Sequence, residues 1–296
     1  MADNLMDRVA SAPISWGVCE VPGWGIQLPP HRVLSEMRSL GIRATELGSI
    51  GFLPTDPGLL RAVLDEHDMR LTGGFVPLPL HDRGAAAQTV EAATEAAALL
   101  AAAGADYFVT CAVSDPHNWK RPELDASQWQ HLIEMLDVVE AVASEQGLVQ
   151  AVHPHVDSLI ETGDEIQRVC DSSPARWVLE TGHMAIGGCD PLRFAREFAS
   201  KVAVVHLKDV RLPIVHQLNI GELSLMAAVQ AGLFPPLGQG DVAIAEVIRM
   251  LEGSGYDGWY VIEQDVAISG TEPVSGCGPI RDVETSVAYI RSIDFD

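Results

Sequence analysis

The chain has 296 residues, of which 47% are hydrophobic and 20% are charged, and its formal net charge is -22. This composition supplies enough apolar side chains for a large core and excludes a disordered chain. The acidic excess disfavours nucleic acid as a partner, because phosphate binding relies on clustered lysine and arginine. The length suits one large domain or two ordinary ones.

The cysteine spacing and the apolar segments indicate a reduced protein without a membrane span. The five cysteines show no CxxC spacing, so neither a disulfide framework nor a thiolate zinc site is expected, and a cytoplasmic protein is the simplest interpretation. Residues 1–8 are polar and acidic, unlike a signal peptide. The Ala-rich segment 85–103 carries Gln88, Glu91 and Glu95, which favours a helix packed on a sheet.

Strand-like and helix-like segments alternate along the whole chain. Eight apolar runs are predicted to form strands, at residues 10–17, 44–48, 70–76, 106–113, 149–155, 177–183, 202–209 and 258–264. Helices are predicted at residues 29–40, 57–67, 85–103, 126–146, 222–231 and 283–290, with two more that start at Thr162 and Pro191. No linker or change in composition interrupts this order, which predicts one closed (β/α)8 barrel over residues 1–296. A doubly wound open sheet is the structural alternative.

A long connection, residues 210–240, follows the seventh predicted strand. Connections of this length inside a compact domain are usually lids or specificity loops. We therefore expect an insertion at 210–240 that covers or shapes a site.

Four consecutive strand candidates end in residues that bind metals or exchange protons. These are His153 and His155 on the fifth, Glu180 and His183 on the sixth, His206 on the seventh, and Glu263 on the eighth. In parallel α/β folds, function lies at the carboxyl ends of the strands. A single histidine there is more often structural, but the repetition over four strands predicts a divalent-metal site.

The common nucleotide-binding and hydrolase motifs are absent from the sequence or lie in the wrong structural context. A GxGxxG pattern at residues 253–258 lies after a helix and before a strand, the reverse of the dinucleotide-binding context, and is interpreted as a turn. The sequence contains no GxSxG elbow, no phosphate-binding GxxxxGK[ST] loop and no HExxH. A nicotinamide or ATP enzyme is therefore not supported.

Taken in order, the motifs resemble the inosose dehydratase family, within the xylose-isomerase-like superfamily of sugar isomerase and epimerase barrels. The likeness spans nearly the whole chain, at residues 12–17, 20–25, 44–48, 51–54, 153–155, 161–162, 181–183, 206–209, 236–241 and 258–265. Each motif is weak alone, but the ordered set is fairly specific.

The resemblance implies a divalent ion, manganese or cobalt first, with magnesium, zinc and iron as alternatives. Carried over by position, its ligands are His153, Glu180, His206 and Glu263. His153 stands where the superfamily has a glutamate, and Glu180 where the branch has an aspartate. The extra methylene of Glu180 places its carboxylate about 1.5 Å further out. Glu180 is then either a ligand with a changed metal preference or a residue that orients the ligands.

The implied reaction is the dehydration of a keto-cyclitol such as 2-keto-myo-inositol. A base removes the proton next to the ketone, the cation stabilises the resulting enediolate, and the β-hydroxyl leaves as water. Glu263 and His183 are assigned to proton transfer, and Lys208 to polarising a substrate oxygen or pairing with Asp209. Substrate contacts are assigned to Glu46, Trp16, His155, Asp209 and Gln264, with Trp24 and Trp119 as further apolar walls. For Glu46, structural hydrogen bonds are the alternative.

Two other functions stay open. A ketose isomerase or 3-epimerase starts from the same enediolate but returns a proton to carbon. A barrel that binds a sugar or cyclitol without turning it over is the third interpretation. The expected partner is a small polyol, keto-cyclitol or ketose, with no nucleic acid and no membrane; homo-oligomerisation is left open.

Overall fold

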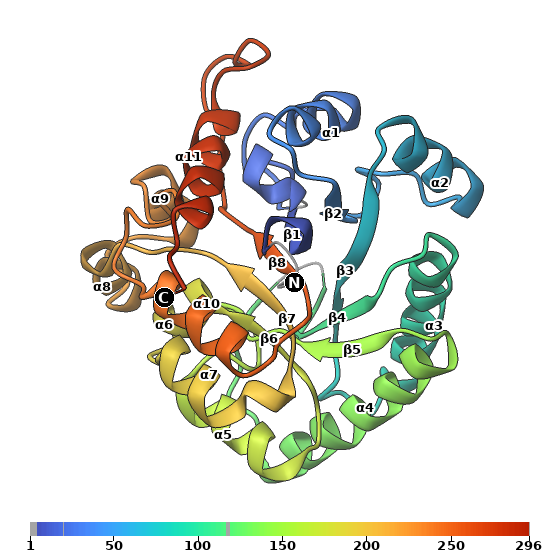
Figure 1. The fold of residues 1–296 in the computed structure, drawn as a ribbon. Coiled ribbons are helices and arrows are strands. Elements are labelled where there is room, and N and C mark those ends of the chain that lie inside the picture. The colour runs from blue at the N-terminus through green and yellow to red at the C-terminus, as the bar shows by residue number, and fades with distance from the viewer. Residues whose placement is uncertain (1–4, 20, 117–118, 296) are drawn as a thin grey trace.

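The computed structural model describes residues 5–19, 21–116 and 119–295 and shows a closed parallel barrel ringed by helices (Figure 1). The strands follow one another around the barrel in chain order, and β1 pairs with β8 to close it. The predicted (β/α)8 fold is thus confirmed. Glu20, in the motif at 20–25, lies outside the described residues.

The eight strands are short and lie at the centre of the molecule. They are β1 Val9–Ser11, β2 Ala44–Glu46, β3 Arg70–Leu78, β4 Tyr107–Ala112, β5 Val149–Val152, β6 Trp177–Glu180, β7 Val202–Leu207 and β8 Tyr260–Ile262. Each matches a predicted run, but most end earlier than predicted because the chain turns where the polar residues begin.

The helices form the outer layer, apart from three short 3-10 helices, η1 Leu5–Arg8, η2 Pro13–Trp16 and η3 Ala199–Lys201. They are α1 Pro30–Ser39, α2 Pro57–Glu66, α3 Ala86–Ala102, α4 Ala126–Glu145, α5 Gly163–Ser172, α6 Thr181–Ile186, α7 Pro191–Phe198, α8 Leu212–Asn219, α9 Leu225–Gln230, α10 Ile244–Gly253 and α11 Pro279–Arg291. No helix in the described part of the chain has the length and apolar character that a membrane span requires.

Local sequence sets the helix starts. Asp125 and Thr162 cap α4 and α5 through capping boxes with Gln128 and Glu165. The predicted start of a helix at Thr162 is confirmed, with Thr162 itself as the cap.

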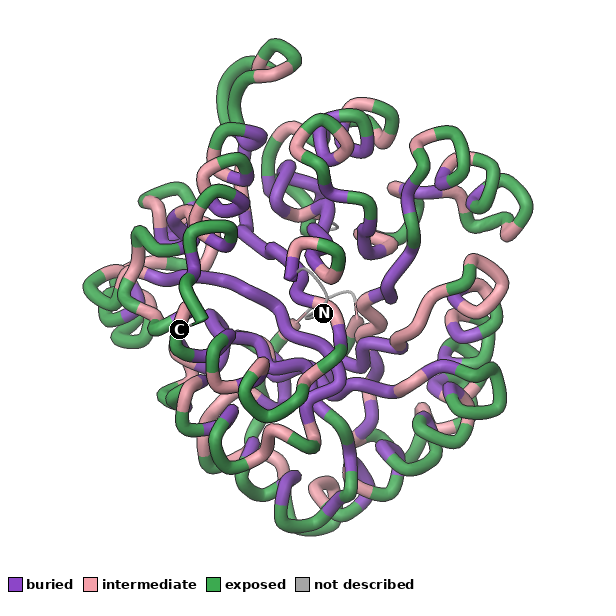
Figure 2. Tube along the Cα trace, in the orientation of Figure 1, coloured by how far each residue is buried: buried purple, intermediate pink, exposed green. Residues whose placement is uncertain are grey.

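Alternation along the strands divides the core into two parts. Trp177 and Leu179 of β6 face the helices, whereas Val178 belongs to a smaller cluster with Val204 and Val261. Side chains alternate between the two faces of a strand, so the next inward positions after these three valines are Glu180, His206 and Glu263. Buried residues gather on the strands and on the helix faces toward them, and exposed residues lie on the outer side of the helices (Figure 2).

Two predicted strands are cut short by helices. The chain after β1 forms η2, because Pro13 has no N–H to give to a ladder and Gly17, at φ 83°, ends the turn. The chain after β6 enters α6 at once, so His183 lies on a helix and not at a strand end.

The long connection folds into two helices. The predicted helix at 222–231 is α9, while α8 was not predicted, although its Pro213 lies in the first turn, where proline is tolerated. α10 was also not singled out. Apolar side chains of this connection, among them Val215 and Phe234, pack with Trp24 and Ile186.

Candidate metal and active site

Four of the predicted site residues meet at the carboxyl ends of β5 to β8. His153 follows β5, Glu180 ends β6, His206 lies in β7 and Glu263 follows β8. All four are buried, and each offers a ligand atom within 4.8 Å of the others. The structure therefore brings together the complete ligand set that the sequence predicted.

His206 is at the centre of the cluster. Its Nδ1 lies 3.4 Å from Glu180 Oε2 and 2.5 Å from Glu263 Oε2. Its Nε2 lies 3.0 Å from Glu46 Oε1, at the end of β2. A carboxylate on one ring nitrogen fixes the ring and its tautomer, so the other nitrogen can face a metal ion. Glu46, predicted as a substrate contact, thus has an orienting position here.

The cluster fits a divalent ion. Glu180 Oε2 is buried and has no hydrogen-bond partner among the described residues, although His206 Nδ1 and His153 Nε2 lie 3.4 and 3.6 Å away. A buried carboxylate oxygen that has no hydrogen bond and is surrounded by other metal-ligand atoms gains a partner when a cation binds there. Two imidazoles and two carboxylates suit manganese, iron, cobalt or zinc.

The second carboxylate oxygen of Glu180 caps a helix. Its Oε1 accepts the backbone N–H of Gly182 at 3.0 Å and of His183 at 3.5 Å, and so caps α6. The longer side chain therefore spans from the helix start to the cluster. This geometry explains how a glutamate can stand at a position where the resemblance implies an aspartate.

Lys208 is the charged centre beside the cluster. Its fully buried ammonium lies 2.7 Å from Glu263 Oε1, 2.8 Å from Asp265 Oδ1 and 2.9 Å from His183 Nε2. The ring of Phe234 from the long connection covers it at 5.1 Å. The proposed pairing of Lys208 with Asp209 is wrong, because its carboxylate partners, Glu263 and Asp265, lie in the segment that follows β8.

Asp209 instead holds the long connection. Its two carboxylate oxygens accept four backbone N–H groups, those of Val210, Gly238, Gly240 and Val242. These bonds occupy the side chain and favour a structural role over the predicted substrate contact.

The charges of the site shift the pKa values of its members. Burial alone would raise the pKa of the Glu263 carboxyl, but the charges of Lys208 and His206 hold it well below its usual range. Burial raises the pKa of Glu180, against the charge of Lys208. Burial, with His155 and Lys208 nearby, lowers the pKa of His183 well below its ordinary value. At neutral pH the site thus pairs an ionised Glu263 with a neutral His183.

Aromatic rings form one side of the site. His155 lies with its ring centroid 3.8 Å from that of His183 and 5.0 Å from that of Trp119. Trp119 stacks on Phe75 at 6.0 Å, and Phe75 meets the edge of His153 at 5.3 Å. The predicted residues His155 and Trp119 therefore lie beside the cluster.

The tryptophans of the first part of the chain lie elsewhere. Trp16 is fully buried in the main core, where its Nε1 donates to Glu36 Oε2 at 2.8 Å, so it does not line the site as expected. Trp24 donates to the carbonyl oxygen of Val266 and packs under the long connection. Apolar rings are common in cores, and sequence gave no means to separate these cases.

Gln264, predicted as a substrate contact, ties β8 to its surroundings. Its amide donates to the carbonyl oxygen of Phe234 at 3.1 Å and to Asp282 Oδ2 at 3.2 Å, while its buried Oε1 has no partner among the described residues. Its side chain thus supports Phe234, which covers Lys208.

Three site residues were missed by the sequence analysis: Phe75, Phe234 and Asp265. Asp265 could have been found, because it lies two positions after Glu263 and an extended chain turns both to one side. Phe75 and Phe234 carried no such signal, since aromatic residues are typical of any core.

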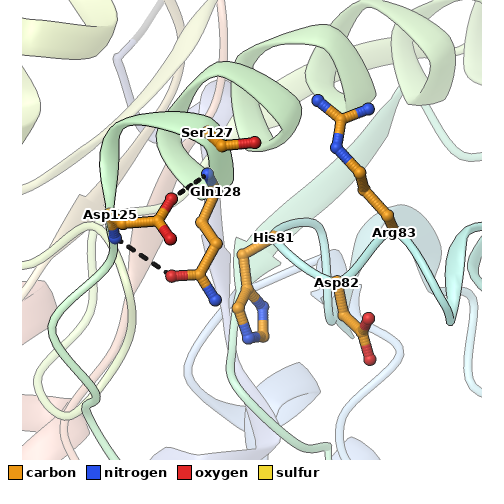
Figure 3. A pocket seen from close by; sticks show the side chains of 6 residues that line it. All are labelled: His81, Asp82, Arg83, Asp125, Ser127 and Gln128. Carbon is orange, nitrogen blue, oxygen red and sulfur yellow. Dashed lines mark hydrogen bonds between the residues drawn. The ribbon is translucent and has the colours of Figure 1, made fainter.

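A separate cavity of about 410 Å³ lies between α4 and the loop that follows β3 (Figure 3). It is lined by His81, Asp82, Arg83, Asp125, Ser127 and Gln128. The two dashed bonds there are the capping box of α4. None of the cluster residues lines this cavity.

Residues 34–293 match the model of a family described as xylose isomerase-like TIM barrel. The chain belongs to this family. Its members share the closed parallel barrel, and the cluster lies at the barrel end where such enzymes place their chemistry.

Curated relatives resemble this chain in sequence over most of its length. Inosose dehydratase from Geobacillus kaustophilus is 30% identical over 88% of this chain and 89% of its own length. The rhizopine catabolism protein MocC from Rhizobium meliloti is 32% identical over 92% and 86%. Inosose dehydratases from Geobacillus thermodenitrificans and Clostridium perfringens are 27% and 26% identical. The chain is accordingly an enzyme.

Solved structures agree in fold at lower identity. A probable 3-DHS dehydratase of petrobactin synthesis from Bacillus anthracis has a TM-score of 0.71 at 12% identity and covers 97% of this chain and 100% of its own. An L-ribulose 3-epimerase has a TM-score of 0.69 at 16% identity, with 96% and 93% covered. This likeness concerns the barrel architecture.

Proposed function

We propose that this family member is a divalent-metal-dependent lyase that removes water from a keto-cyclitol of the inosose class. The buried cluster of two imidazoles and two carboxylates beside a charged lysine carries the proposal. The inosose dehydratases that resemble the chain over about nine tenths of its length support the substrate class.

His153, Glu180, His206 and Glu263 are the proposed ligands, with manganese or cobalt as the preferred ion. A bound divalent cation would supply the positive charge that stabilises an enediolate next to the ketone. The protein itself orients this site: Glu46 fixes the His206 ring, and α6 fixes Glu180.

Glu263 is the proposed base. It is ionised at neutral pH and takes the proton from the carbon next to the ketone, and the electron pair of that bond moves into the enediolate. Its second oxygen already faces the cluster. Phe234 covers the site and helps to exclude water from it.

Lys208 is the proposed acid, and His183 positions it. The hydroxyl on the next carbon leaves as water when it receives a proton from the ammonium of Lys208, which lies 2.9 Å from the neutral ring of His183. Glu263 then returns the proton it took to Lys208, at 2.7 Å. Protons balance over the cycle, because one is taken from carbon and one is given to the leaving hydroxyl.

The test is mass spectrometry of a panel of inososes, rhizopine and ketohexoses, incubated in heavy water with the protein and manganese or cobalt. We expect one inosose to lose water. Deuterium uptake into a ketohexose without water loss would replace the proposal by a ketose isomerase or 3-epimerase. No change in any compound, with metal bound, would favour a binding role.

A further inference from the structure

A second group of possible metal ligands lies where α1 begins and α2 ends. These two helices are neighbours in the outer layer (Figure 1). His31 belongs to the first turn of α1, and Glu66 and His67 stand at the end of α2. The three side chains offer donor atoms within 4.8 Å of one another. Residues 35 or more positions apart are thus brought to one point on the surface.

The rings of His31 and His67 are spaced like two imidazoles that bind one metal ion. Their centroids lie 5.0 Å apart, with the planes inclined by 60°. An imidazole nitrogen binds zinc at about 2.0–2.1 Å, and two rings on one tetrahedral ion then have centroids about 5 Å apart. The observed spacing needs little adjustment to admit a cation.

Nothing else in the described structure engages these donors. Neither the two imidazoles nor the Glu66 carboxylate has a hydrogen bond or ion pair with another described residue, whereas Asp68, close by, holds both Arg38 and Arg43. His31 and Glu66 are exposed and His67 is half-buried, so solvent ions reach the donors. The net charge of -22 further raises the local concentration of cations.

We propose that His31, Glu66 and His67 form a second, surface metal site that binds a borderline divalent cation such as zinc, cobalt or nickel. Two imidazoles and one carboxylate favour these ions over magnesium and calcium, which prefer all-oxygen sites. Three protein donors leave the remaining positions of the ion to water. A bound ion links the start of α1 to the end of α2.

The experiment counts bound zinc by native mass spectrometry of the full chain at micromolar zinc. The double variant His31→Ala/His67→Ala should bind one zinc ion fewer than the wild type, whatever the barrel cluster holds. His216→Ala removes an exposed histidine of α8 and should leave the count unchanged. Circular dichroism checks that the double variant is folded, as expected for exposed positions.

An equal zinc count in the wild type and the double variant would overturn the proposal. So would an ion that binds near α1 and α2 only at millimolar zinc, or equally well when magnesium replaces zinc. Because His206→Ala affects only the barrel cluster, loss of one ion in that variant and of another in the double variant would show two independent sites.

Discussion

Lys208 is a fully buried lysine that forms ion pairs with Glu263 and Asp265. Breaking a buried ion pair by removing one partner costs roughly 3–5 kcal/mol, because the remaining charge is left without compensation. We expect Lys208→Met to lower the free energy of unfolding by this amount and to abolish turnover. Urea unfolding followed by circular dichroism measures the first effect.

Adding Asp265→Asn to Lys208→Met gives the control. It removes one of the two carboxylates that face Lys208, so part of the lost stability should return. If the double variant is no more stable than Lys208→Met alone, the loss comes from packing of the lysine stem and not from charge.

The imidazole of His155 makes the free energy of unfolding depend on pH in the acidic range. Burial, with Lys208 next in effect, lowers the pKa of His155 from 6.5 to about 4. Between these two pH values His155 is protonated in the unfolded chain but neutral in the folded chain. The free energy of unfolding therefore falls as the pH decreases through this window. His155→Gln removes this contribution, at most about 3 kcal/mol, and should flatten the dependence.

Unfolding in urea near neutral pH and again between pH 4 and 6.5 measures the effect of His155→Gln. The exposed His216→Gln serves as the matched control and should keep the slope of the wild type. An unchanged slope in His155→Gln would mean that the other buried histidines carry the acid sensitivity.

At the scale of elements, α6 packs directly against the end of β7. A Cβ on Gly182 would lie 2.6 Å from Lys208 Cγ and 2.8 Å from its Cδ. Gly182→Ala therefore forces the lysine stem to move, and we expect it to cost about 1–3 kcal/mol of stability and most of the turnover. Thermal unfolding and initial rates measure the two effects.

Gly253→Ala is the matched control, because a Cβ at the last position of α10 meets nothing within 4 Å. It should be neutral or slightly stabilising. If both alanines reduce turnover equally, the tight contact between α6 and Lys208 is not the reason.

At the scale of the whole molecule, the periodic features of the sequence predicted the barrel well. Apolar runs marked all eight strands, and their polar ends marked His153, Glu180, His206 and Glu263, because strand order in a barrel brings consecutive carboxyl ends together.

The parts that sequence did not predict depend on contacts between distant segments. Lys208 and Asp209 are neighbours, yet Lys208 pairs with two carboxylates just after β8 and Asp209 with the backbone of the long connection. Trp16 and Trp119 were indistinguishable as sequence, yet one lies in the core and the other beside His155. Side-chain direction at such positions is decided by packing.

In the proposed function, turnover requires a divalent ion held by the barrel cluster. The direct measurement is the rate of water loss from the inosose substrate, before and after metal removal, together with the manganese or cobalt content of the same samples. We expect activity to disappear with the metal, to return with manganese or cobalt, and to be absent in a folded His206→Ala that no longer holds the ion. Full turnover without metal, or in His206→Ala, would contradict the account.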